Sequence, residues 1–511
     1  MTAATTEAPN HRAAITLSVM LATIMQALDT TIANVALPHM QGSMSATQDQ
    51  ISWVLTSYIV ASAICMPLTG FLSARFGRKR IFMYAVFGFT VTSMLCGAAQ
   101  SLEQIVLFRL LQGICGASLV PLSQSVLLDS YPKERHGSAM AMWGVGVMIG
   151  PILGPSLGGW LTEYYSWRWV FYINMPLGVL TWFGLAMYVK ETPIDVKRRF
   201  DGLGFAFLGL SIGALQMMMD RGHSQDWFSS NEIVIEALLC GFATYMFVVH
   251  IFTTPRAIIE PGVFKDRNFS LGLVFIFIMG VILLATLALL PPYLQGLMGY
   301  KVIDVGLLLA PRGFGTMAAM MIAGKLAGRI NVRVLIATGL SLTAFSMWEM
   351  TLFNTLISGW DVVRTGLVQG LGFGLIFVPL STVTFSTLAP YYRNDGTSLY
   401  SLVRNIGSSI GISIVITYLA QQVQANHAAL AVYINPFAIS LRDLSSHGVI
   451  NLASPQSLTL INGEVSRQAA TLAYLQDFRL MIWVTLAALP LVIFLRTPGQ
   501  TRSGPSQVAL D

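Results

Sequence analysis

The sequence predicts an all-α, polytopic membrane protein with fourteen transmembrane helices, built as two parallel six-helix repeats plus two inserted helices. Three observations support this prediction. Of the 511 residues, 54% are hydrophobic and 11% are charged, whereas a soluble globular protein has about 25% charged residues. The mean hydropathy of the whole chain is +0.65, which one anchor helix attached to a soluble domain cannot produce. The third observation is an internal repeat of the apolar runs.

The apolar runs follow one another along the whole chain. A hydrocarbon layer of about 30 Å requires about 20 helical residues. Runs of roughly this length, bounded by polar or turn residues, span Ala14 to Ala36, Ser52 to Ser73, Ile81 to Ala99, Gln104 to Leu128, Ser138 to Leu161, Trp169 to Val189, Leu203 to Met219, Ile233 to Phe252, Phe269 to Leu290, Val305 to Leu326, Val334 to Phe353, Val362 to Phe385, Ser398 to Leu419 and Phe478 to Leu495. The first run is too long for a signal-peptide core, so we expect it to remain as the first helix.

The basic residues predict the orientation of these helices. When alternate loops are assigned to opposite sides, twenty of the thirty Lys and Arg residues fall on the side of the N-terminus and five on the other side. Because cytoplasmic loops carry the excess of Lys and Arg, both termini are predicted to be cytoplasmic. The net charge of +6 is therefore a topology signal, and it gives no reason to expect a nucleic-acid partner.

The chain resembles itself at an offset of about 250 residues. The tetrapeptide VPLS occurs at 120–123 and at 378–381, and the loop at 70–80 matches the loop at 324–333. Helices 1 to 6 thus repeat as helices 9 to 14 in the same orientation, a pattern typical of secondary transporters. We predict an N-terminal half at 1–190, inserted helices 7 and 8 at 191–268, and a C-terminal half at 269–511. The inserted helices are expected to lie beside the two halves and to tolerate substitution.

Three motifs carry a resemblance to a known family. LDTTIANVALP at 28–38, GPILGPSLGG at 150–159 and WRWVFYINMPLG at 167–178 resemble motifs of helices 1, 5 and 6 in the major facilitator superfamily, within the fourteen-span drug:proton antiporters. The segment at 215–230 and the polar segment at 421–476 resemble a branch that works with a periplasmic membrane-fusion adaptor and an outer-membrane channel. The resemblance implies these two partners for the present chain, with segment 421–476 in the periplasm.

The resemblance also implies roles for individual residues. Asp29 and Arg109 are expected to couple export to protons, since a carboxyl group inside a span is costly and usually faces a cavity or a partner. The depths of the two residues below the outer surface match, so they could pair. Two structural alternatives stay open: Asp29 bonded to Thr30, Thr31 or Asn34, and Arg109 reaching the interface.

Helix 5 and the loop after helix 2 contain the expected gating residues. The helix 5 motif comprises Gly150, Pro151, Gly154, Pro155, Gly158 and Gly159. The resemblance implies that this motif acts as a gate. The alternative interpretation is ordinary helix packing, because small residues permit two helices to approach closely. The loop motif comprises Gly70, Arg75, Gly77 and Arg78, but Ala74 occupies the position where the family has an acidic residue. The gating interaction of that acid is therefore not expected here.

The substrate cavity is expected to include Asn34, Arg312 and Arg404. The two arginines could accept anionic amphiphiles, or they could bond only to backbone carbonyls. Glu349 is the other interior acid, on a helix expected to face lipid.

The predicted function is proton-coupled export of lipophilic or amphiphilic toxic compounds across the bacterial inner membrane by alternating access. The alternatives are a dedicated exporter of one metabolite or siderophore, and a non-transporting receptor or scaffold. No enzyme activity, cofactor or metal is expected, because the sequence has no nucleotide-binding GxxxxGK[ST] loop, no HExxH motif and no Cys/His spacing typical of zinc sites.

Overall fold

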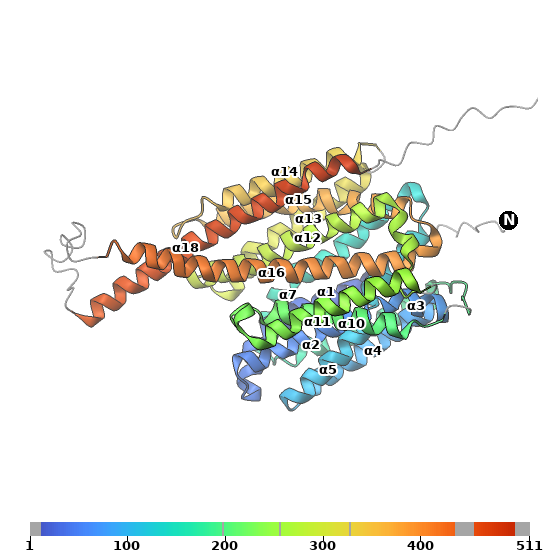
Figure 1. Cartoon of the computed structure of the whole chain (residues 1–511), viewed down its shortest axis with the longest axis horizontal. Helices are drawn as coiled ribbons and strands as arrows, with labels where there is room; N and C mark the ends of the chain where they lie inside the picture. Colours follow the sequence, from blue (N-terminus) through green and yellow to red (C-terminus); the bar gives the residue numbers. More distant parts are fainter. Residues whose placement is uncertain (1–11, 197–198, 255–256, 327–328, 435–453, 496–511) are drawn as a thin grey trace, which may run out of the picture.

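The computed structural model describes residues 12–495 except 197–198, 255–256, 327–328 and 435–453. The described part is a bundle of long helices (Figure 1). In chain order they are α1 (Arg12–Met44), α2 (Gln48–Cys65), α3 (Leu68–Phe76), α4 (Arg78–Ala98), α5 (Leu102–Gly116), α6 (Leu119–Ser130), α7 (His136–Tyr164), α8 (Trp169–Tyr172), α9 (Asn174–Tyr188), α10 (Gly202–Arg221), α11 (Asn231–Thr253), α12 (Arg267–Pro292), α13 (Val302–Leu326), α14 (Val332–Met350), α15 (Gly359–Ser386), α16 (Arg393–Ala431) and α18 (Pro455–Ala488).

Local sequence explains where several helices begin and bend. Thr47 starts α2 with a capping box that includes Gln50, and Ser358 starts α15 in the same way with Asp361; each box satisfies two backbone N–H groups of the first turn. Pro67 separates α2 from α3, which together form one span bent by 56°. Such a bend is expected where proline interrupts the backbone hydrogen bonds of a helix.

The number of spans is close to the predicted fourteen. Each predicted apolar run falls on a helix or a broken helix. In the described chain, twelve helices are long and apolar enough to cross a membrane, and the bent pair α2–α3 makes a thirteenth. The remaining run falls on α14, in which Arg333 and Glu349 lower the hydropathy. The all-α, multi-pass fold is confirmed, whereas the exact count of fourteen stays a prediction.

Helix packing repeats along the chain as the sequence repeat predicts. Helix α1 packs on α7 as α12 packs on α16, and α2 packs on α5 as α13 packs on α15. The VPLS segments also have equivalent local bonds: Ser123 Oγ donates to the Val120 carbonyl at 2.7 Å, and Ser381 Oγ donates to the Val378 carbonyl at 3.0 Å. The two halves therefore share one architecture.

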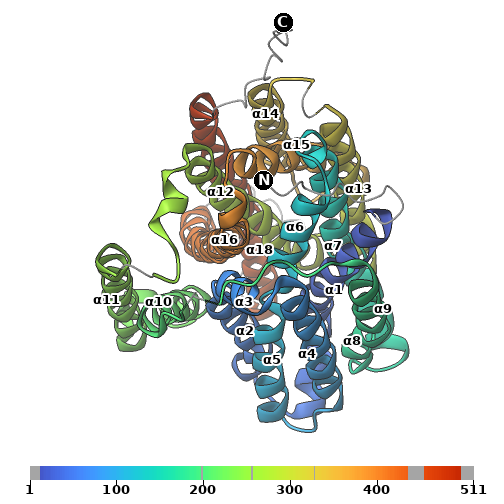
Figure 2. The same cartoon turned by 90° about the vertical axis from the view of Figure 1, so that its right-hand side faces the viewer.

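The inserted helices lie at the outside of the bundle (Figure 2). Helix α11 packs on α10, and α10 packs on both α2 and α16, which belong to different halves. Gln216 of α10 accepts a hydrogen bond from Ser409 of α16 at 2.7 Å, and Asp220 accepts one from Thr56 of α2. Helix α10 thus connects the halves, which the sequence analysis did not anticipate.

Helices α16 and α18 extend beyond the other helices at one end of the bundle (Figure 1). Residues 421–431 of α16 and 455–476 of α18 form this helical hairpin, and residues 435–453 of the predicted polar segment lie outside the described residues. Asn426 donates to Gln476 at 3.1 Å across the hairpin. We call this end of the bundle the hairpin side. We call the opposite end, where α1 begins, the N-terminal side.

Candidate functional site

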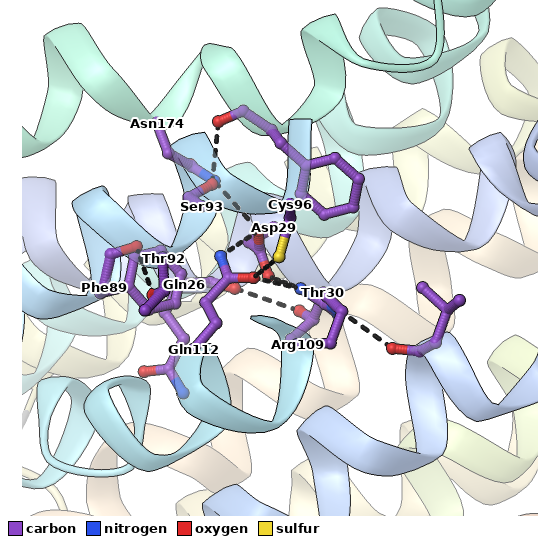
Figure 3. Close-up of polar contacts among 12 residues, drawn as sticks. Gln26, Asp29, Thr30, Phe89, Thr92, Ser93, Cys96, Arg109, Gln112 and Asn174 are labelled. Carbon is purple, nitrogen blue, oxygen red and sulfur yellow. Dashed lines mark hydrogen bonds and ion pairs between the residues drawn. The ribbon is translucent and has the colours of Figure 1, made fainter. Parts of the chain in front are cut away.

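A buried polar cluster joins the helices of the N-terminal half (Figure 3). Asp29 of α1 and Arg109 of α5 form an ion pair, in which Arg109 Nη1 lies 2.6 Å from Asp29 Oδ2 and each side chain is 1% exposed. The predicted pairing is therefore present. Arg109 is too deeply buried for the alternative in which it reaches the interface. Asp29 bonds to neither Thr30, Thr31 nor Asn34 among the described contacts.

Further donors hold the Asp29 carboxylate in place. Gln112 Nε2 donates to Asp29 Oδ1 at 2.9 Å, and Asn174 Nδ2 of α9 donates to the same oxygen at 3.0 Å. With Arg109, three N–H donors surround one carboxylate, and such charge-assisted bonds are roughly twice as strong as neutral ones. The cluster is thereby electrically compensated, which offsets part of the cost of burying either charge.

Arg109 is fixed by contacts besides Asp29. Its Nε donates to the Val54 carbonyl at 3.1 Å, and Nη1 also donates to Gln112 Oε1 at 2.9 Å. The guanidinium carbon lies 4.3 Å from the centre of the Tyr58 ring, within the range of a cation–π interaction. Val54 and Tyr58 belong to α2, so Arg109 links three helices, and its position depends on how α1, α2 and α5 pack.

Sequence reasoning missed Gln112, Asn174 and Tyr58. Gln112 follows Arg109 by three residues, which places both on one helix face, and this spacing was an available signal. Asn174 belongs to the WRWVFYINMPLG motif. It is uncharged, so the cost of placing a charge in the membrane, which identified Asp29, gave no signal for it.

The helix 5 motif lies against α1. A Cβ atom added to Gly150 would lie 2.4 Å from the Ala27 carbonyl carbon, and one added to Gly154 would lie 2.2 Å from Thr31 Oγ. Gly158 also faces α1, whereas Gly159 has open space around it. Pro151 and Pro155 lie inside the continuous helix α7. The close-packing interpretation is thus supported for three of the four glycines.

The equivalent contacts recur in the C-terminal half. A Cβ atom on Gly407 would lie 2.3 Å from the Phe277 carbonyl oxygen, and one on Gly411 would lie 2.6 Å from Val281 Cα. Small residues therefore set the same helix spacing twice, between α1 and α7 and between α12 and α16.

The loop after helix 2 contacts the opposite half on the N-terminal side. Arg78 of α4 pairs with Asp129 at the end of α6, and Arg393 of α16 pairs with the other oxygen of Asp129. Ser125 Oγ donates to Asn394 Oδ1 at 2.5 Å. Gly77 has φ +96°, a conformation that favours glycine. The bonds of Asp129 and Ser125 thus join the two halves on the N-terminal side. The predicted loop residue Arg75 is half-buried and has no hydrogen bond with the described residues.

An acidic side chain occupies this region although Ala74 does not supply one. A Cβ atom on Gly70 would lie 1.8 Å from Asp395 Oδ1 of α16, so the carboxylate lies directly against α3, one helical turn before Ala74. The acid thus comes from the C-terminal half. In the second repeat, Gly324 likewise lies against Gly137 of α7 in the opposite half.

The predicted cavity residues are not brought into one cluster. Asn34 is exposed and donates to the Thr30 carbonyl of its own helix at 3.1 Å. Arg312 is 5% exposed, its Nη2 reaches the Leu283 carbonyl only at 3.5 Å, and its Nη1 has no partner among the described residues. Arg404 is half-buried and forms no ion pair within the described chain.

Other buried polar groups accompany these arginines. Gln369 of α15 is fully buried, and neither polar atom of its side chain has a partner in the described structure. Glu349, by contrast, pairs with Arg364 at 2.9 Å, so it does not neutralise either arginine. The C-terminal half therefore contains a buried cation, Arg312, whose guanidinium carbon lies 5.2 Å from the centre of the Phe373 ring and which no acidic residue of the described chain neutralises, unlike Arg109 in the N-terminal half.

Comparisons with known proteins agree with this architecture. A family model described as Major Facilitator Superfamily matches residues 19–412. The multidrug export protein EmrB of Haemophilus influenzae is 34% identical over 96% of both chains. The fatty acid resistance protein FarB of Neisseria gonorrhoeae is 34% identical over 96% of this chain and 97% of its own.

A solved structure shows the same fold at low sequence identity. The crystal structure of the human organic anion transporter MFSD10 (TETRAN) has a TM-score of 0.57, is 14% identical, and covers 94% of this chain and 100% of its own. The family model and the sequence relatives that match nearly the full length establish that the chain belongs to the Major Facilitator Superfamily.

Proposed function

We propose that this chain is a proton-coupled exporter of lipophilic and amphiphilic toxic compounds that works by alternating access between its two halves. The similarity to EmrB and FarB over nearly the whole chain supports export of such compounds. The observation that carries proton coupling is the buried pair of Asp29 and Arg109. A membrane carboxylate whose partner can move away is able to change its proton affinity.

The pair provides a specific coupling step. Arg109 bonds to α1, α2 and α5 simultaneously, so a rearrangement of these helices separates it from Asp29. The carboxylate then lacks its strongest donor and takes up a proton. When the pair forms again, the proton is released. Moving one charge across 100 mV is worth about 2.3 kcal/mol, enough to bias an equilibrium between two conformations by more than tenfold.

The proposed orientation places the N-terminal side in the cytoplasm of a bacterial inner membrane, in agreement with the excess of basic residues there. The hairpin side then faces the periplasm. In the structure, the halves are joined on the N-terminal side through Asp129 and Arg393. Breaking this bridge would be required for the cavity to open to the cytoplasm.

The helical hairpin is the proposed contact with a periplasmic adaptor, which would lead to an outer-membrane channel. The hairpin exposes Leu458 and Leu460 near its tip, and Val432 and Tyr433 are exposed directly after α16; no other described element covers these side chains. Replacing Leu458 and Leu460 by serine should abolish resistance in cells and leave export by purified protein unchanged. Equal losses in both assays would count against adaptor docking.

The test of proton coupling uses proteoliposomes with an imposed pH gradient. Asp29→Asn should retain substrate binding and lose gradient-driven export. Glu103→Gln, which removes an exposed acid on the same helix as Arg109, is the matched control and should export at the wild-type rate. If Asp29→Asn vesicles export at the wild-type rate, Asp29 has a structural role and the proposal is wrong.

The uncompensated arginines favour one group of substrates. We propose that Arg312 and Arg404 bind the acidic group of anionic amphiphiles, a preference consistent with the name of the relative FarB. A fatty acid and its methyl ester share the same chain and differ in charge. Export should therefore be selective for the acid, and Arg312→Gln should reduce that selectivity. Equal export of acid and ester by the wild-type protein would exclude this role.

A further inference from the structure

Asp477 lies in the middle of the buried face of α18. Tyr474, Asp477, Phe478 and Met481 have the spacing of one helix face, and all four are buried, with Asp477 fully so. The rings of Phe478 and Phe353 meet edge to face with their centres 6.3 Å apart, and the ring centres of Tyr474 and Tyr293 are 5.3 Å apart. An acidic side chain thus occupies one position of an otherwise aromatic and apolar surface, far in sequence from Asp29.

Both carboxyl oxygens of Asp477 are buried and have no hydrogen-bond partner among the described residues. None of the titratable and charged groups on α18, or on the described elements packed against it, forms a hydrogen bond with Asp477. On the short turn at 293–297 and on α14 and α12 they are Tyr293, which donates to the Asn354 carbonyl; Glu349, paired with Arg364; Arg333, which donates to the Leu495 carbonyl; and Arg267, at the far end of α12. On α16 they are Arg393, Asp395, Tyr400 and Arg404, many turns from the hairpin; the half-buried Tyr418; and His427, bonded to Asn462. On α18 itself they are Glu464 and Arg467, which pair with each other in the hairpin; Tyr474, within the same aromatic surface; and the exposed Arg479.

This environment contrasts with that of Asp29. Asp29 accepts bonds from three side chains, including a guanidinium, whereas Asp477 accepts none in the described structure. The free-energy cost of burying an unpaired, ionised carboxylate away from water is so large that such a group takes up a proton and becomes neutral instead. A proton also requires no additional space, so the tight aromatic packing is compatible with the neutral acid.

The position of Asp477 indicates where the proton exchanges. The preceding residue, Gln476, bonds to Asn426 at the base of the helical hairpin, and Phe353 and Tyr293 lie at the hairpin-side ends of α14 and α12. Asp477 therefore lies within about one helical turn of the hairpin side. A small separation of α18 from these ends would expose the carboxyl group to water on that side.

We propose that Asp477 is a second proton-binding site, in the C-terminal half, which is protonated in this conformation and exchanges its proton with the hairpin side during transport. This inference rests on the proposed function, because it assumes that export is coupled to protons. Each half would then contain one protonatable aspartate: Asp29 pairs with an arginine, and Asp477 is held neutral by apolar packing.

Infrared difference spectroscopy of the purified full-length protein tests the protonation state directly. The wild type should show the carbonyl band of a protonated carboxyl group, and Asp477→Asn should lack one such band. Glu103→Gln, the exposed-acid control, should retain it. Asparagine resembles the neutral acid in shape and charge, so we expect this variant to fold. An unchanged band in Asp477→Asn would show that Asp477 is ionised and would overturn the proposal.

Proton counting in proteoliposomes tests the exchange. The number of protons moved per substrate should fall by about half in Asp477→Asn relative to the wild type, while substrate binding persists. An unchanged ratio overturns a transport role for Asp477. If the wild-type protein moves no protons at all, the proposed function fails; the infrared band then still decides whether Asp477 carries a proton, so the two failures can be distinguished.

Discussion

Replacing Gly150 by alanine should destabilise the contact between α1 and α7. The added Cβ would lie 2.4 Å from the Ala27 carbonyl carbon and 2.6 Å from the Ala27 Cβ, about 1 Å closer than ordinary van der Waals contact. Because the obstacle is mainly backbone, no rotation of a side chain can relieve it. The two helices must therefore move apart near Asp29, which lies only two residues after Ala27.

The size of the effect follows from the contacts that are disturbed. Forcing extra methylene groups into a packed core costs about 1–3 kcal/mol. The separation also weakens the hydrogen bond that Thr31 Oγ donates to the Gly150 carbonyl at 3.1 Å, and such a bond contributes about 0.5–1.5 kcal/mol. Alanine gains about 1 kcal/mol of helix propensity over glycine, which partly offsets the loss.

Gly159→Ala isolates the packing effect from the propensity effect. Gly159 lies on the same helix, and no atom would lie within 4 Å of its added Cβ, so this variant gains propensity without a clash. In equilibrium unfolding in mixed micelles, Gly150→Ala should be less stable than Gly159→Ala by about 1–3 kcal/mol from the clash, plus up to about 1.5 kcal/mol from the weakened hydrogen bond, since the gain in propensity is common to both variants. Equal stabilities of the two variants would refute the close-contact argument.

Three other outcomes are expected. Arg109→Lys should reduce gradient-driven export in proteoliposomes at least tenfold and leave substrate binding intact, because one ammonium group cannot reproduce the bonds to Asp29 and the Val54 carbonyl; wild-type export would contradict this. Arg393→Ala should speed thiol labelling of a cysteine introduced at Ser398, since Asp129 loses its partner in the opposite half; unchanged labelling would show that the bridge does not hold this end closed. Gln216→Leu should lower the midpoint of unfolding because it removes the acceptor for Ser409 of α16; an unchanged midpoint would show that α10 tolerates the substitution.

The pair of Asp29 and Arg109 could be predicted because the depth of a residue in the membrane follows from its distance along the helix from the end of the span. The predicted first span ends at Ala36, but α1 continues to Met44 with Pro38 inside it. The pair forms nevertheless, because it depends on how α1 and α5 pack and not on where α1 ends. Counting residues from an apparent helix end therefore identified the correct partner.

Contacts between distant segments could not be predicted in the same way. The bridge from Asp129 to Arg393 joins residues 264 positions apart, and its existence depends on which conformation the two halves adopt. The helical hairpin was predicted only as a polar segment, because its residues lack the apolar run that identifies a span. The role of α10 was missed because its polar residues face two halves that the sequence does not place side by side.

The two repeats share their scaffold and differ in their buried charges, and this difference is the basis of the roles proposed for them. Gly154 and Gly158 approach α1 as Gly407 and Gly411 approach α12, so the repeat determines how each half is packed. The buried charges follow no such symmetry: the N-terminal half compensates Arg109 with Asp29, whereas Arg312 has no acidic partner in the described C-terminal half. A compensated pair is suited to exchange a proton, and an uncompensated cation requires an anion from outside the protein. Under the proposed function, proton exchange at Asp29 and binding of the substrate charge at Arg312 would take place in different halves. The two events would then be coupled through contacts between the halves, such as that of Asp129 with Arg393.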